Sequence, residues 1–364
     1  MARRRRAGSG IGGAVATVPT EDQLSGGVPA GLPAMRIGSG IGHLPYYGRQ
    51  ILFKDAMLQS QPFWAQPNDS TWPDGTPGNP FTAATSVAHV NGYPQADPVG
   101  GGWWKTVMRT GLAGNYESGT WHVIHDGNCR IRVWGDNASR GSAATFNGTG
   151  GTFTLTTPGN SGLHLELDQI VTPPTRIAVV PAAYVASYLT DPFHPTALST
   201  LAHYKILRFM DQCGSFSELA NWADRTTMGW QTQHRELNQG AIANPNYNTY
   251  GGWARRWSTD YGMAVEYMVD LCNTLGADLY VCFPAKATDD YVTQMVTLIR
   301  GRLNPGLKIY YEFGNEDWNT NFPQMVWMAG QANTRTEVQF PWTHPELSFL
   351  TPGAASNETA PVLA

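Results

Sequence analysis

Two periods of apolar residues alternate along the second half of the chain. Short apolar runs at 204–210, 277–283 and 308–313 have the length and the composition of buried strands. Between them, apolar residues return every three or four positions over about 260–275 and 288–303, which is the spacing of one helix face. The pattern therefore predicts strand, helix, strand, helix and strand.

This order is typical of a parallel α/β sheet, and units of roughly thirty residues fit a (β/α) barrel. An apolar segment at 35–41 and a helical spacing over 47–59 predict a first strand and its helix, and 195–203 predicts another helix. An open doubly wound sheet is the alternative. No G-x-G-x-x-G run follows a strand, so nothing in the sequence indicates a dinucleotide, and no cofactor is expected.

The intervening segment has a period of two instead. Runs that alternate or are wholly apolar lie between turn residues at 121–125, 129–134, 152–156, 163–167 and 176–180. Strands spaced this closely predict a β-sandwich-like module. The predicted fold is α/β plus all-β, a partial (β/α) barrel with a β-sandwich inserted between barrel strands one and two.

Composition narrows the classes of function. A formal charge of -4 and a pI of about 6.1 give no general electrostatic reason to bind nucleic acid or an anionic membrane. No apolar run approaches the ~18 residues of a membrane span. The basic run Arg3 to Arg6 is the exception, and it lies in a Gly- and Pro-rich start that predicts a flexible or assembly-docked arm. The glycines after it are unlike the apolar core of an export signal.

The cysteines and histidines show no metal-ligand spacing. The four cysteines are far apart and form no C-x-x-C pair, so buried free thiols are expected at Cys129, Cys213, Cys272 and Cys282. No metal site is predicted.

Candidate chemistry lies where the predicted parallel strands end, because barrel proteins carry their functional residues on the loops that follow. Arg208 and Asp211 lie at the end of the second strand, and Asn315 and Glu316 follow the fourth. These side chains are expected to lie close together.

The residues around these positions resemble a known family. The run Ile309-Tyr-Tyr-Glu-Phe-Gly-Asn-Glu-Asp-Trp-Asn319 resembles the fourth-strand signature of clan A retaining glycoside hydrolases, and Ile206-Leu-Arg208-Phe resembles their second strand. The resemblance covers roughly residues 35–330 and extends to bacterial secreted proteins related to cellulose- and xylan-active enzymes. It implies that Glu316 is the general acid/base, that Asn315 binds a sugar 2-hydroxyl, and that Arg208 is a charge partner.

Hydrolysis of a glycoside requires a second carboxyl group. The family places it on the seventh strand, yet only 48 of the 364 residues follow Glu316, and four more strand–helix units need roughly 120. Glu312 lies on the same side of its strand as Glu316, but roughly 13 Å away along it, beyond the ~5–9.5 Å of a catalytic pair. Ala285 also stands where relatives tend to carry a histidine. Catalysis by this chain alone is not expected.

Structural interpretations compete with these roles. Glu316 is equally suited to cap a helix or to pair with Arg208, and Arg208 is suited to an internal ion pair. Trp222 and Trp318 belong to a set of tryptophans that fits either a sugar-stacking platform or simple packing.

Two functions follow. The first is a carbohydrate-binding or structural component derived from a glycoside hydrolase, extracellular or virion-associated, such as a phage fibre or surface protein. It binds polysaccharide, with a protein partner or copies of itself over the open barrel. The alternative is an active retaining β-glycosidase whose second carboxylate comes from another chain or from further sequence.

The predicted segments are an arm (1–34), the first strand and helix (35–59), the sandwich (60–190), strands two to four (191–335) and a Pro-rich tail (336–364).

Overall fold

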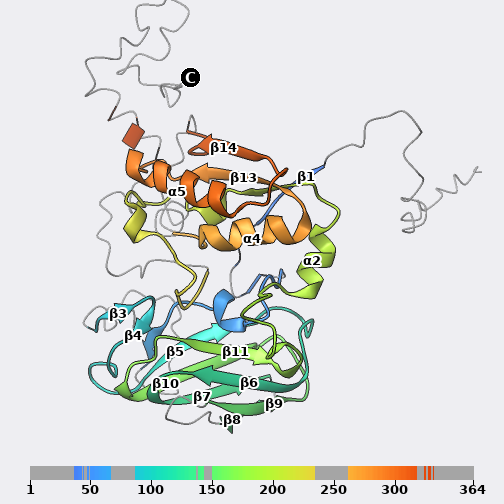
Figure 1. Ribbon diagram of the computed structural model, residues 1–364. Helices are drawn as coiled ribbons and strands as arrows, with labels where there is room; N and C mark the ends of the chain where they lie inside the picture. Colours follow the sequence, from blue (N-terminus) through green and yellow to red (C-terminus); the bar gives the residue numbers. More distant parts are fainter. Residues whose placement is uncertain are drawn as a thin grey trace, which may run out of the picture. The chain divides into compact units, whose positions relative to one another are not determined.

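The structure, a computed structural model, describes two bodies of secondary structure joined in one compact unit (Figure 1). The described residues are 37–42, 44, 47–48, 50–66, 87–136, 138–142 (backbone only), 150–233, 261–317, 324, 327–328 and 331. The predicted arm, the Pro-rich tail and Trp318 lie outside them.

One body is built on a four-stranded parallel sheet. Its strands are β1 (Gly38–Gly40), β12 (Ile206–Phe209), β13 (Asp278–Phe283) and β14 (Ile309–Phe313). They lie side by side in chain order, and every neighbouring pair is parallel. The predicted parallel pairing of these segments is therefore confirmed.

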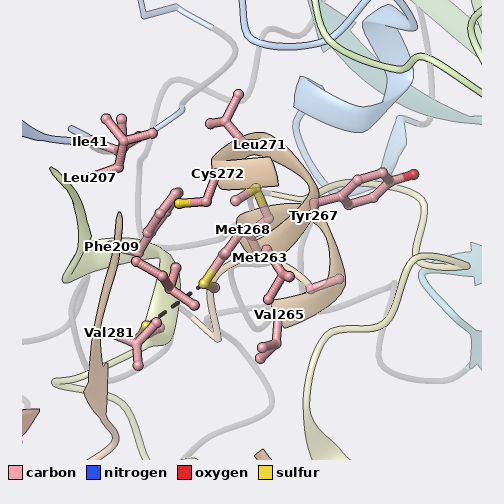
Figure 2. Close-up of a cluster of buried hydrophobic side chains, with 14 of the residues drawn as sticks. Ile41, Leu207, Phe209, Met263, Val265, Tyr267, Met268, Leu271, Cys272 and Val281 are labelled. Carbon is pink, nitrogen blue, oxygen red and sulfur yellow. Dashed lines mark hydrogen bonds between the residues drawn. The ribbon is translucent and has the colours of Figure 1, made fainter. Parts of the chain in front are cut away.

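Helices cover one face of this sheet. They are α2 (Pro195–Leu201), α4 (Val265–Leu275) and α5 (Asp289–Arg302), and they confirm the predicted helices. The hydroxyl of Thr288 caps α5 by accepting a hydrogen bond from the Tyr291 amide, while Gly276 ends α4 in the left-handed conformation. Alternate strand residues such as Leu207 and Val281 pack with the inner face of α4 in a common apolar core (Figure 2).

The other body is a pair of antiparallel sheets around a second apolar core. The larger sheet has the order β2 (Trp64–Gln66), β5 (Trp103–Met108), β10 (Leu163–Thr172), β7 (Asn128–Gly135) and β8 (Ala138–Ser142). The smaller has the order β11 (Ile177–Pro181), β6 (Gly119–His125) and β9 (Gly151–Leu155). A separate hairpin joins β3 (His89–Val90) to β4 (Tyr93–Pro94). The strands predicted within 121–180 are all present.

The helix predicted over 47–59 is wrong. Among the described residues of this segment, the only helical element is a 3-10 turn, η1 (Ala56–Gln59). The preceding residues are extended and pair with the segment that leaves the sandwich, since the Lys54 amide donates to the Pro192 carbonyl and the His194 amide to the Leu52 carbonyl. These long-range bonds use the backbone groups that a helix would have needed.

The chain thus enters and leaves the sandwich through two adjoining segments. Phe53 and Phe193 stack there at 6.0 Å, and the ring of Tyr267 from α4 meets Phe53 edge-on at 5.1 Å. This aromatic junction connects the core of the parallel-sheet body to the base of the sandwich.

Candidate functional site

Arg208 is the centre of the polar cluster at the carboxyl end of the parallel sheet. Its Nη2 donates to Glu312 Oε2 at 2.6 Å and to Asn315 Oδ1 at 2.6 Å. The guanidinium also lies over the ring of Tyr280, 5.2 Å from its centroid. One arginine on β12 therefore binds a carboxylate on β14 and the amide just after it.

Strand register explains why these residues meet. Arg208 pairs with Tyr280, and Cys282 pairs with Glu312. Side chains at paired positions lie on the same face, which here is opposite the face that packs on the helices. Regular strand backbone is enough to bring these side chains together, and an unusual backbone conformation begins only after the end of β14.

The electrostatics of the cluster favour an ionised Glu312. Partial burial would raise the pKa of Glu312, but the hydrogen bonds from Arg208 and from the Cys282 thiol outweigh it, and the pKa lies below its ordinary value. Burial would lower the Arg208 pKa, but the hydrogen bond to Glu312, the nearby negative charge and the hydrogen bond to Tyr280 together outweigh it, so the pKa of Arg208 is raised. Glu312 is therefore a fixed anion, unsuited to donate a proton near neutral pH.

The chain turns sharply after β14. Gly314 has a φ of 66°, and a side chain there would collide with the Asp317 carboxylate, 2.1 Å from the position of a Cβ. The Asn315 amide donates to Asp317 Oδ1 at 3.3 Å, and Glu316 also adopts a left-handed φ of 50°. Burial, aided by the negative charge of Glu312, raises the pKa of Asp317 to about 6.

Asn315 and Glu316 differ in their surroundings. Asn315 is buried, and its amide oxygen is held by Arg208, so its NH2 is the group that remains to meet a ligand. The Glu316 side chain is exposed. A general acid ordinarily lies in partly buried surroundings, which the exposed Glu316 lacks.

The remaining predicted site residues serve other contacts. Asp211, half-buried, begins the 3-10 turn η4 (Asp211–Cys213) directly after β12. Trp222 opens η5 (Trp222–Asp224), where the Arg225 guanidinium covers its ring at 3.9 Å and Tyr291 meets it edge-on. Trp222 therefore packs within the protein in this structure.

Sequence reasoning missed the role of Glu312. It treated Glu312 only as a candidate second carboxyl, whereas the structure makes it the partner of Arg208. The signal was available in the alternation of the strand, which places Glu312 and Tyr310 on the same face. The thiols were predicted correctly, since all four cysteines are buried and free.

Among the described residues, no three His, Cys, Asp or Glu side chains gather in a way that would hold a metal ion. Within the same part of the chain, no helix has the length and apolar content needed to cross a bilayer. Comparison with protein-family models, with curated proteins and with solved structures found no match to this chain.

Proposed function

We propose that this chain is a carbohydrate-binding or structural component built on a partial (β/α) barrel. The four parallel strands follow one another in chain order, and the helices that connect them pack on one face. A doubly wound sheet instead reverses its strand order and carries helices on both faces. The order found here supports barrel ancestry.

The observation that carries the proposed function is the double hydrogen bond from Arg208 to Glu312 and Asn315. It fixes a buried amide at the end of a parallel strand, where this class of fold binds its ligands. Tyr280 and Tyr310, whose rings lie 5.9 Å apart, add aromatic surface to the same face. An oriented amide beside aromatic rings suits a polyhydroxylated ligand.

Binding without hydrolysis fits the carboxyl groups best. Glu312 is engaged by Arg208 and Glu316 is exposed, so neither has the surroundings of a general acid. Hydrolysis, with Glu316 as the acid/base and a second carboxylate from another chain, is the competing function. The raised pKa of Asp317 is the one observation in its favour, because it shows that a carboxyl at this turn is protonated more readily than usual.

The test is calorimetric titration of the full chain with soluble β-glucan and xylan oligosaccharides. Asn315→Ala and Arg208→Gln should each weaken binding at least tenfold. Arg225→Gln is the matched control, because Arg225 also forms a part-buried ion pair, but with Glu266 at 3.0 Å and not with Glu312 or Asn315. Equal binding by all three variants would remove the proposal. Release of shorter sugars from these oligosaccharides, with loss of that release in Glu316→Gln, would establish the competing function, hydrolysis.

The proposed partners include a protein that covers the open side of the barrel, or further copies of this chain in an extracellular or virion assembly. The last strand, β14, has Tyr310, Tyr311 and Phe313 exposed, the last of these at 55%. Exposed aromatic residues on an edge strand favour association. Light scattering over a concentration series should show oligomers. The double variant Tyr311→Lys, Phe313→Lys should dissociate them into monomers. A monomer at all concentrations would contradict self-assembly.

A further inference from the structure

A cavity of about 420 Å³ lies at the junction of the two bodies, apart from the strand-end cluster. This volume is within the ~300–1,000 Å³ of typical small-molecule sites. Residues from η1, the hairpin, β11 and α4 contribute to its lining, which includes Asp55, Tyr93, Arg176, Tyr188, Trp230 and Tyr267.

Asp55 supplies a buried acceptor to this cavity. The side chain is only 3% exposed, and its Oδ1 accepts hydrogen bonds from the Met57 amide at 3.0 Å and the Val179 amide at 2.9 Å. Its Oδ2 accepts no hydrogen bond from any described residue. A ligand hydroxyl that reaches this oxygen would find an acceptor with no partner among the described residues.

Arg176 supplies donors at the exposed side of the same cavity. Its backbone amide is bound to Asp126, but its guanidinium donates to no described residue and instead lies over the Tyr188 ring at 5.2 Å. Neither Tyr188 nor Tyr267 uses its hydroxyl in a hydrogen bond within the described part of the chain. In Figure 2 the Tyr267 ring extends from α4 away from the other labelled side chains of the core.

Trp230 forms an aromatic wall that the backbone holds in place. The next residue, Gln231, donates its amide to the Asn91 carbonyl at 2.8 Å. Gly92 has a φ of +82°, and a Cβ built on it would lie 3.4 Å from the Trp230 ring. The turn before β4 therefore lies close to the indole.

Charge selects the class of ligand. A free anion would be repelled by Asp55 in the cavity, and a simple cation by the Arg176 guanidinium at its exposed side. Asp126, the other carboxylate of the lining, is occupied by the Thr175 hydroxyl and by two backbone amides. What remains is an acceptor, several donors and a flat aromatic face, which suit a neutral molecule whose hydroxyls both donate and accept.

We infer that this junction cavity binds a single pyranose-sized sugar unit, with Trp230 against the sugar ring and with Asp55 and Arg176 hydrogen-bonded to its hydroxyls. The site is independent of the strand-end cluster and does not require the function proposed for it. It gives the chain a second point of attachment to a glycan.

The experiment is ligand-observed NMR and calorimetry on the full chain, with methyl β-glucopyranoside and methyl β-xylopyranoside as probes. Trp230→Ala and Arg176→Gln should each weaken binding at least tenfold. Arg302→Gln, which breaks an exposed ion pair on α5, should leave it unchanged. Thermal melts identify any variant that has lost its fold. Because Arg176 is exposed, Arg176→Gln is the variant least expected to unfold the protein.

Three results would overturn the inference. One is the absence of binding for both glycosides. Another is binding that Arg208→Gln abolishes while Trp230→Ala and Arg176→Gln do not, since that places the sugar at the strand ends alone. The third is displacement of the glycoside by millimolar glycine, because a zwitterion that spans Asp55 and Arg176 would then be the better ligand.

Discussion

Polar residues alternate with apolar ones along strands in both bodies, but they are within reach of solvent in one body and buried in the other. On the parallel sheet, Arg208 and Glu312 lie on the face that the helices leave free, and their side chains are 30% and 29% exposed. On β10 of the sandwich, His164, Glu166 and Asp168 also face away from the apolar core, yet all three are buried.

The sandwich buries these groups in a ladder of ion pairs. Arg132 Nε lies 3.0 Å from Glu166 Oε2, Trp134 donates to the other oxygen of Glu166 at 2.7 Å, and Arg130 binds Asp168. Lys105 lies over the Trp134 ring at 4.6 Å. A polar residue on a strand therefore indicates a binding site only where a ligand can reach its side chain. The alternation of polar and apolar residues in the sequence does not distinguish such a residue from a buried one.

The largest effect is expected from breaking the ladder. Glu166 is 1% exposed, so Glu166→Ala removes the partner of the Arg132 Nε and of the Trp134 indole, and leaves Arg132 only its longer contact with Asp168 at 3.4 Å. Removing one partner of a buried pair costs about 3–5 kcal/mol. Urea unfolding followed by circular dichroism measures this loss of stability.

Glu166→Gln is the matched control for the ladder. It retains an acceptor for the Trp134 indole and should lose less than Glu166→Ala. A loss below ~1 kcal/mol for Glu166→Ala would mean that the buried pair behaves like an exposed one, and the contrast between the two bodies would fail.

The junction between the bodies should make stability depend on pH. Burial raises the pKa of Asp55 from 3.8 to about 6, although hydrogen bonds from Val179 and Met57 oppose the shift. The folded state then holds this proton more tightly than the unfolded state, so the associated stability is complete below about pH 4 and is lost as pH rises to about 6. The size is on the order of 3 kcal/mol. Asp55→Asn keeps the Oδ1 acceptor and should remove this dependence in unfolding measured from pH 4 to 7.

Glu117, also at the junction, should respond with the opposite sign. Burial would raise the pKa of Glu117, but the hydrogen bond and charge of His194 outweigh it, so the folded pKa is below the ordinary value. Its contribution is present above that ordinary value and is lost as pH falls through the folded pKa. Glu117→Gln should therefore be most destabilising at neutral pH and least so in acid. The same sign for both variants would contradict the assignment of these shifts.

The fold was predictable where one period extended over a whole element. The alternation Leu163, Leu165 and Leu167 indicated β10, and the cap at Thr288 together with its apolar spacing indicated α5. β5 was not predicted because the polar residues Lys105 and Thr106, which lie on opposite faces of the strand, are both buried, so no alternation of apolar and polar residues is visible.

Long-range contacts account for the other misses. The segment 47–59 has helical spacing, but pairing with residues near Pro192 overrides it. The approach of Arg208 to Asn315 was predictable from strand ends alone, whereas its bond to Glu312 depends on the register between β12, β13 and β14. The junction cavity joins residues from Asp55 to Tyr267 that no local pattern connects.

The smallest effect on stability is expected at the strand ends. Glu312→Ala removes the carboxylate partner of Arg208, but both side chains reach solvent, so water replaces much of the interaction and the loss should be about 1 kcal/mol or less. Oligosaccharide binding should fall more than stability, because Arg208 would then hold Asn315 alone. Paired measurements of urea unfolding and calorimetric titration separate the two effects. A stability loss as large as that of Glu166→Ala, with binding unchanged, would show that this cluster is a structural ion pair like the ladder in the sandwich.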